Sequence, residues 1–467
     1  MRSKWFRLVA VLLALVMVAA ACGSDDDDGG DVAAEAEAPA EEEAEPEPEA
    51  EPEEEAEPEP EPEEEAEPEP EPEEEAAGGE DCSAGGDGLR VGTALPETGP
   101  LAFLGPPMIQ AVNLAICDIN AAEGVNGALV SLSPGDSATD PDIANATVDR
   151  LLGSENVDAI VGAASSGTSS AIIDKITGAP AVQCSPSNTA AGLGVEGDGG
   201  FYFRTAPSDD LQAPTLANLI LNDGFANVAL VSRADEYGVG FNDFFIPAFE
   251  EGGGTVVYSD PFAPEAQTFD DVVADVVASG PDAVVVIAFE EGIQIIQTMV
   301  EQGVGPDVIQ IYITDGMATG ELGVLIDPDN PNIAEGIKGT QPSAAPASGA
   351  AFFPDAFAAY APGVDAIFSS QAYDCAILIA LGAEASGSNE PADIAAAIVE
   401  VTRGGEKCST FAECKELIAS GADIDYDGAA GPLEFLDAGE PGAATYDIYL
   451  YDADGVQQVT EQVDFAI

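Results

Sequence analysis

The sequence from residue 89 onward predicts an α/β protein built from parallel sheets flanked by helices. Short aliphatic runs alternate with longer amphipathic stretches, and this order is typical of parallel strands joined by crossover helices. About 380 residues take part, which is more than one such sheet usually accommodates, so we expect two α/β lobes. Ligands of open parallel sheets bind beyond the carboxyl ends of the strands. Candidate binding residues should therefore follow the aliphatic runs.

The expected strands are runs of Val, Ile, Leu and Ala, which suit strands buried on both faces. They cover residues 89–94, 159–163, 179–184, 228–232, 255–258, 283–288 and 309–314. The expected helices place apolar residues three or four positions apart. They include residues 109–122, 212–223, 269–279 and 292–302.

The N-terminus has the pattern of a secretory signal. A basic start precedes an apolar run over residues 8–21, which is shorter than the ~20 residues of a membrane-spanning helix. The run ends at Ala19-Ala20-Ala21-Cys22, which resembles the cleavage box of bacterial lipoproteins, although a leucine is usual where Ala19 stands. We therefore expect a signal peptide over residues 1–21 and lipidation of Cys22, which would anchor an exported protein to the outer face of the cytoplasmic membrane. A plain secretory signal or a membrane anchor is the alternative.

A segment rich in Glu and Pro follows. Residues 56–65 read AEPEPEPEEE and recur identically at 66–75. Such a segment has almost nothing apolar to bury, so it cannot offset the entropy of ordering. We expect residues 22–88 to form a disordered, lipid-anchored tether; a metal-binding or partner-binding tail is the alternative.

The charge of the chain is strongly negative, with a formal net charge of −76. After Cys82, 57 acidic residues stand against 9 basic ones, a net charge near −48. A field of this sign repels nucleic acid, so we expect no such partner. Few lysines and evenly spread carboxylates indicate adaptation to a salty exterior, where the repulsion is screened. Like-charge repulsion also favours a monomer.

The residue types argue against catalysis and against a cofactor. The chain contains no histidine, which removes Ser-His-Asp and Cys-His mechanisms and most zinc sites. The single tryptophan, Trp5, lies in the signal, so a carbohydrate site would lack its usual aromatic platform. We expect a protein that is not an enzyme, with no metal and no cofactor, and a secreted hydrolase is the remote alternative.

Six cysteines follow Cys22, and an even number in an exported chain suggests disulfides. Six cysteines can form three disulfides in fifteen possible ways. Only two lie close in sequence, Cys408 and Cys414, and they would close a short loop at a helix start. For the other four we favour Cys82 with Cys117 and Cys184 with Cys375. Buried free thiols are the alternative.

Two polar turns follow neighbouring expected strands. Residues 165–170 read SSGTSS and precede the helical AIIDKI, and residues 184–189 read CSPSNT. A strand leading through Ser and Gly into a helix directs backbone N–H groups and hydroxyls at one place, which suits an anion such as a carboxylate. Ordinary helix capping by serine is the alternative.

These turns belong to a longer stretch of sequence that resembles the solute-binding proteins of branched-chain amino-acid ABC importers. The resemblance runs from LRVGTALPETGPLAFLGPPMIQ through DAIVGAASSGTSS, SPSNTA, FRTAPSDD, ADEYGVG and TDG to YDGAAGPLEF, and it covers nearly all of residues 89–467. It implies a two-lobed, Venus-flytrap fold with three crossover hinges, placed near residues 207, 340 and 432. Lobe 1 would comprise 89–207 plus 341–431, and lobe 2 would comprise 208–340 plus 432–467.

The resemblance also implies roles for residues. Ser166 and Thr189 would bind a ligand carboxylate, and backbone groups around Thr168, Ser187 and Asn188 would complete that end. Tyr237 would close over the ligand, and Asp315 would bind its ammonium group. The shorter Asp315 stands where the family commonly has glutamate, and capping of the following helix is an alternative role for it. Phe103, Leu104 and Phe289 are candidates for an apolar wall, while Glu290 and Glu291 suit a polar side chain.

The function that this resemblance implies is a receptor that delivers a branched-chain or other apolar amino acid to an ABC permease. The same fold in relatives also suits an amide, urea or small aromatic acid, or a sensor that reports its ligand to a signalling partner.

Residues 423–434, DIDYDGAAGPLE, match the calcium-loop pattern. Such a loop should lie between two helices, whereas Leu433-Glu434-Phe435 is typical of a strand. We therefore expect a turn here, with calcium as the alternative.

Overall fold

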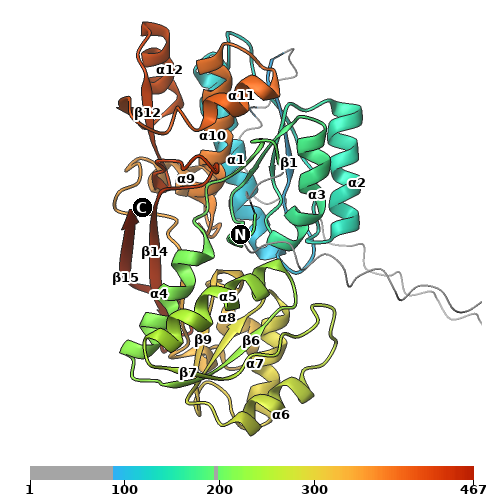
Figure 1. Cartoon of the computed structure of the whole chain (residues 1–467), viewed down its shortest axis with the longest axis vertical. Helices are drawn as coiled ribbons and strands as arrows, with labels where there is room; N and C mark the ends of the chain where they lie inside the picture. The colour runs from blue at the N-terminus through green and yellow to red at the C-terminus, as the bar shows by residue number, and fades with distance from the viewer. Residues whose placement is uncertain (1–81, 83–87, 194–197, 467) are drawn as a thin grey trace, which may run out of the picture. The chain divides into compact units, whose positions relative to one another are not determined.

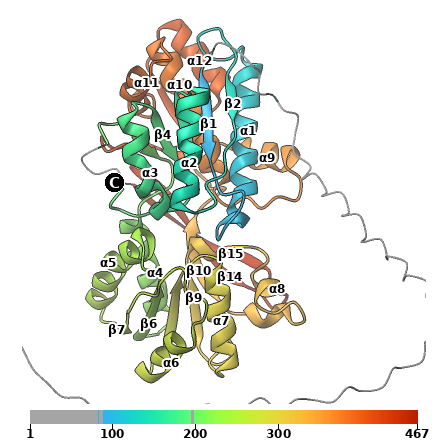
Figure 2. The same ribbon diagram turned by 90° about the vertical axis from the view of Figure 1, so that its right-hand side faces the viewer.

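The computed structural model describes residues 82, 88–193 and 198–466, which form two α/β lobes, each around its own large sheet (Figures 1 and 2). The predicted α/β class is confirmed. The predicted signal peptide, the lipidation site Cys22 and nearly all of the predicted tether lie outside the described residues.

The first lobe is built on a parallel sheet in the order β2-β1-β3-β4-β5. Its strands are β1 (Arg90–Ala94), β2 (Ser131–Ser133), β3 (Ala159–Gly162), β4 (Val182–Ser185) and β5 (Tyr202–Arg204). Alternate residues face two different cores: Ile160 packs with α2 and α3, whereas Val161 packs with α1 and α10. Helices therefore cover both faces, as the buried aliphatic runs predicted.

The helices of this lobe begin at typical signals, such as the Asp140 side chain, which accepts hydrogen bonds from the first-turn N–H groups of α2. The helical segments are η1 (Ala102–Leu104), α1 (Gly105–Ala121), α2 (Pro141–Arg150), η2 (Leu151–Glu155), α3 (Ser166–Gly178), α9 (Phe353–Tyr360), α10 (Ser369–Ser386), α11 (Pro391–Ile398) and α12 (Phe411–Ser420). Residues 102–121 are long and apolar enough to cross a membrane. They are 56% buried, however, and α1 packs against α10 (Figure 1) as a core helix does.

The second lobe is built on the sheet β15-β14-β10-β9-β8-β6-β7. Its strands are β6 (Asn227–Ser232), β7 (Thr255–Tyr258), β8 (Ala283–Ile287), β9 (Gln310–Ile313), β10 (Lys338–Pro342), β14 (Ala443–Tyr451) and β15 (Gln457–Ala466). Its helical segments are α4 (Asp209–Asn222), α5 (Glu236–Glu251), α6 (Asp270–Ser279), α7 (Glu291–Glu301), η3 (Asp315–Met317), α8 (Leu322–Ile326) and η4 (Pro331–Ala334). Helix α4 packs on α5, and α6 packs on α7.

Two features of the strands differ from the predictions. The edge of the second sheet is antiparallel, because β14 pairs antiparallel with both β10 and β15. The strand predicted at Leu433-Glu434-Phe435 is wrong. A two-residue strand β13 (Gly431–Pro432) precedes it and pairs with β12 (Ile424–Gly428), which also pairs with β11 (Glu406–Cys408). Glu434 has φ 44°, in the left-handed region, so the backbone cannot continue extended.

The three favoured disulfide pairings are confirmed. The structure joins Cys82 to Cys117, Cys184 to Cys375 and Cys408 to Cys414. Cys184 on β4 and Cys375 on α10 are both buried in the core. Their bond therefore links the first sheet to a helix 191 residues later in the chain.

Candidate functional site

A narrow, partly open cavity lies between the two lobes, where strands β3, β4, β8 and β9 end, and its empty volume of about 250 Å³ includes space reached by solvent. The first lobe contributes Leu101, Leu104, Ala164, Ser165, Ser166, Ser187 and Phe368, and the second contributes Tyr237, Phe289, Asp315 and Gly316. The carboxyl ends of parallel strands are the usual ligand site of such sheets. The cavity is therefore the candidate binding site.

One end of the cavity is lined by hydroxyl groups at a helix start. Ser165 caps α3, because its Oγ accepts a hydrogen bond from the Thr168 N–H at 3.4 Å. Ser166 is the first residue of α3, is 3% exposed, and its Oγ accepts from the Ala190 N–H at 3.3 Å. The Ser166 hydroxyl hydrogen can still be donated, and a helix N-terminus favours negative charge. This end suits a carboxylate.

The turn after β4 is tied to the turn after β3. The Ser187 hydroxyl donates to the Ala164 carbonyl at 3.1 Å, and the Asn188 side-chain amide donates to the same carbonyl at 2.8 Å. Ser187 lines the cavity, whereas Thr168, Asn188 and Thr189 are buried beside it and do not line it.

The second lobe contributes a buried carboxylate to the cavity. Asp315 is 4% exposed, and its Oδ1 accepts hydrogen bonds from the Gln212 side-chain amide at 2.8 Å and from the Tyr237 hydroxyl at 3.1 Å. The Tyr237 hydroxyl also bonds to the Thr314 hydroxyl at 2.7 Å and accepts from the Gly316 N–H at 3.3 Å. Tyr237 is thus held against the carboxylate.

Burial raises the pKa of Asp315 to about 6, although the hydrogen bonds from Gln212 and Tyr237 favour its charged form and lower the pKa. At pH 7 Asp315 is therefore mostly ionised and offers an anion to a ligand cation. Below pH 6 it is mostly neutral.

Phe289 forms one wall and is held on two sides. Its ring stacks on Tyr237 with centroids 5.4 Å apart, and the Arg233 guanidinium carbon lies 3.8 Å from the ring centroid. Arg233 in turn forms ion pairs with Asp235, at 2.8 Å, and with Glu291. Glu291 was predicted to contact a polar ligand side chain, but it forms an ion pair with Arg233 within the protein.

Asp209, at the start of α4, is a second buried carboxyl group near the site. It is fully buried, and neither of its oxygens has a hydrogen bond of normal geometry among the described residues. Burial, followed by the charge of Asp315, raises the pKa of Asp209 well above its ordinary value. Asp209 therefore favours its neutral form beside an ionised Asp315.

Sequence analysis did not predict Leu101 and Phe368, which line the cavity, or Arg233, Asp209 and Gln212, which lie behind its lining. Phe368 has φ 55°, a conformation uncommon for a bulky residue, and its side chain lines the cavity. No spacing pattern marks these residues. Phe103, by contrast, was predicted as a wall of the ligand site but lies outside this cavity and lines a neighbouring one.

The calcium-like segment holds a lysine at its centre. Lys407 Nζ lies 2.9 Å from Asp425 Oδ2, 2.9 Å from Asp427 Oδ1 and 3.2 Å from Glu434 Oε1. An ammonium group thus neutralises the carboxylates that a calcium ion would need. The segment comprises β12, a two-residue turn and β13, and it does not form a loop between two helices.

The two-lobed fold and its interlobe cavity define a solute-binding receptor of the type I periplasmic class. The family model described as periplasmic binding protein matches residues 88–455. The chain belongs to this family.

Relatives and solved structures agree with this assignment. A substrate-binding protein of a chemotactic signal transduction system from Halobacterium salinarum is 27% identical over 76% of this chain and 85% of its own length. A Leu/Ile/Val-binding protein homologue from Brucella melitensis is 27% identical over 42% of this chain and 53% of its own length.

The fold is shared with solved binding proteins. An isoleucine complex of a branched-chain amino-acid binding protein from Streptococcus pneumoniae has a TM-score of 0.67 at 22% identity, covering 81% of this chain and 99% of that one. A binding protein from R. palustris in complex with 4-hydroxybenzoate has a TM-score of 0.65 at 20% identity, covering 82% and 98%.

Buried carboxyl groups also set the pH dependence of stability. Asp374 on α10 accepts hydrogen bonds from the Tyr426 hydroxyl and from the Ala429 and Ala430 N–H groups, yet burial raises its pKa to about 7. Because Asp374 and Asp315 bind protons more tightly in the folded than in the unfolded chain, their stabilisation is complete below about pH 4 and is lost as the pH rises to about 7.

We therefore expect the melting temperature of the ligand-free protein at constant high salt to fall between pH 4 and pH 7, and Asp374→Asn to flatten this slope. Asp136→Asn is the matched control, because hydrogen bonds lower the pKa of Asp136 and its removal should steepen the fall. A melting temperature that rises over this interval would contradict the assignment.

Proposed function

We propose that this protein is an exported receptor that captures an amino acid with an apolar side chain and delivers it to an ABC permease. The observation that carries the proposal is the cavity itself. Hydroxyls at a helix N-terminus of the first lobe, the buried Asp315 carboxylate of the second lobe and several apolar side chains line the same cavity. This arrangement complements a zwitterion with an apolar side chain.

In this proposal Ser166 and Thr189 hold the ligand carboxylate, with backbone groups near Thr168, Ser187 and Asn188. Asp315 binds the ammonium group and Tyr237 closes over it. Thr189 lies behind the cavity wall in this structure, where its side chain interacts with the buried Asp209 carboxyl group, so holding a ligand would require it to turn toward the cavity. Hinge closure at the crossovers near residues 207, 340 and 432 would bring the lobes together around the ligand.

The relatives support an amino-acid ligand and also a second candidate function. The Leu/Ile/Val-binding homologues favour a branched-chain ligand and the importer function. The Halobacterium relative belongs to a chemotactic system, which favours a sensor. An importer receptor predicts that deletion of the gene abolishes uptake of labelled ligand, whereas a sensor predicts loss of the response to that ligand with uptake intact.

The proposed location, the outer face of the cytoplasmic membrane, rests on the sequence. A lipid on Cys22 and the Glu/Pro-rich tether would keep a monomeric receptor near its permease. The acyl chains would contribute about 0.8 kcal/mol per buried CH₂ group.

The decisive experiment titrates the purified protein, in high salt, with amino acids, amides, urea and small aromatic acids while recording heat and melting temperature. A bound ligand at 100 times its Kd stabilises the folded state by about 2.7 kcal/mol. We expect apolar amino acids to bind and benzoate to be silent. Binding of aromatic acids alone would replace the amino-acid assignment, and binding of none of these ligands would overturn the proposed function.

A further inference from the structure

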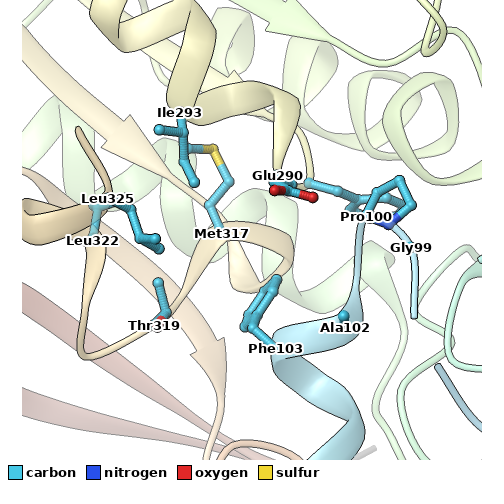
Figure 3. A pocket seen from close by; sticks show the side chains of 11 residues that line it. Gly99, Pro100, Ala102, Phe103, Glu290, Ile293, Met317, Thr319, Leu322 and Leu325 are labelled. Atoms are coloured by element: carbon cyan, nitrogen blue, oxygen red, sulfur yellow. The ribbon is translucent and has the colours of Figure 1, made fainter. Parts of the chain in front are cut away.

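A second, larger pocket adjoins the candidate binding cavity. It is partly open, with an empty volume of about 520 Å³ that includes space reached by solvent, and it lies between η1 of the first lobe and α7, η3 and α8 of the second. Figure 3 shows the Phe103 ring facing Met317, with Ile293, Leu322 and Leu325 on the far side. We call this space the apolar pocket.

The apolar pocket and the candidate binding cavity share a wall. Phe289 lines both of them, and the chain passes from one lining to the other at Pro100-Leu101 and again at Gly316-Met317. A hydrogen bond of 3.3 Å from the Glu290 N–H to the Pro100 carbonyl joins the two lobes beside this wall. The two spaces are therefore separated by one aromatic ring and the backbone next to it.

The lining determines which chemistry the pocket can hold. Its side chains are hydrocarbon except for Glu290, Thr319 and the Met317 thioether, and Figure 3 shows the Glu290 carboxylate at one side of the space. Leu325 is 40% exposed in this structure, so part of the apolar lining faces solvent. Covering this hydrocarbon surface with an apolar group removes it from water, which is favourable in free energy.

We propose that the apolar pocket is the side-chain subsite of the ligand cavity and selects amino acids that carry an aromatic ring or a long unbranched aliphatic chain. This inference rests on the proposed function, because the charged groups of such a ligand must first be held by Ser166 and Asp315. Valine would end before the pocket and leave it empty. Phenylalanine or methionine extends further from its α-carbon and reaches past the edge of Phe289.

The test measures the affinities of valine, methionine and phenylalanine for the full protein and for two variants, by calorimetric titration in high salt. Leu325→Glu places a carboxylate at the pocket, and Val324→Glu is the matched control. Both residues lie in α8 and are exposed, at 40% and 49%, but Val324 does not line the pocket.

We expect the wild-type protein to bind phenylalanine and methionine at least tenfold more tightly than valine. Leu325→Glu should reduce the phenylalanine and methionine affinities at least tenfold and change the valine affinity less than twofold, whereas Val324→Glu should change none of them. Melting temperatures of both variants check that they fold.

Two outcomes would overturn the subsite. Valine binding as tightly as phenylalanine, or an equal loss of all three ligands in Leu325→Glu, means that the pocket is filled by the protein's own side chains on closure. In both cases the proposed function stands, because amino acids still bind the wild-type protein. If the wild-type protein binds no amino acid at all, the proposed function itself falls.

Discussion

Asp315→Asn is expected to weaken binding of a zwitterionic amino acid by about 2–5 kcal/mol, which is roughly 30-fold to several thousand-fold in Kd. The substitution keeps the shape of the side chain but removes the anion, so a buried ligand ammonium loses its charged partner. The variant should still fold, because the amide oxygen can accept the hydrogen bonds that Gln212 and Tyr237 donate to Asp315. Calorimetric titration of the best ligand at pH 7 measures the effect.

The pH dependence of binding gives the same prediction a second readout. Because the pKa of Asp315 in the empty site is about 6, a proton competes with the ligand ammonium below that pH. The affinity of the wild-type protein should therefore fall about tenfold per pH unit below pH 6 and level off above pH 7. The affinity of Asp315→Asn should stay flat over this interval.

Asp209→Asn is the matched control for this experiment. Asp209 is also a buried carboxyl group, but it does not line the cavity, and its raised pKa favours the neutral form that asparagine imitates. We expect its Kd to stay within about threefold of the wild-type value. A loss as large as that of Asp315→Asn would show that the ligand ammonium binds deeper, between the two carboxyl groups.

Removal of the Cys184–Cys375 disulfide by a double alanine substitution is expected to destabilise the folded protein by about 5 kcal/mol. The bond closes a loop of 191 residues that includes most of the second lobe. In the chain-entropy description a loop of this length restricts the unfolded chain by about 5 kcal/mol, whereas a loop of about six residues restricts it by roughly 2 kcal/mol. Urea unfolding at constant salt measures the difference.

The Cys408–Cys414 disulfide, which closes a six-residue separation, is the internal control. Its double alanine variant should lose about 2 kcal/mol, less than half the loss at Cys184–Cys375. Equal losses in the two variants would contradict the loop-length argument and would assign the effect to packing around the sulfur atoms.

The central strands could be predicted because both of their faces are buried. β8 begins at Ala283 as predicted and ends at Ile287, one residue before the predicted end, since such strands read as continuous aliphatic runs. The predicted run 255–258 also matches β7 to the residue, although β7 lies at an edge of its sheet and is partly exposed. The strands β2 and β5 have three residues each and carry no such signal, so they were missed. The antiparallel pair β14–β15 was missed because it alternates polar and apolar residues at the edge of a sheet.

The candidate site was predictable only in part. Ser166, Ser187, Tyr237, Phe289 and Asp315 line one cavity, and each of them follows a strand in the sequence, but the resemblance to branched-chain amino-acid binding proteins was needed to single them out. Their ligand roles stay predictions.

Other contributors acquire their roles from contacts across the fold. Arg233 touches Phe289, and Gln212 donates to Asp315 across 103 positions of the chain. Residues so far apart leave no periodic pattern in the sequence.

The sequence by itself determined the α/β class, the order of the aliphatic strands and the helices between them, the charge of the exterior and the polar turns at the strand ends. Each of these properties depends on composition or on the spacing of residues that are near in sequence. The repeat of the helix or strand then fixes which face a residue lies on, or whether it lies at the end of a strand. The tertiary structure alone decided which strands lie next to each other, which cysteines pair, that Lys407 pairs with the carboxylates of the acidic turn, and that Phe289 lies between two cavities. These properties depend on distances between residues remote in sequence, and such distances exist only once the chain has packed.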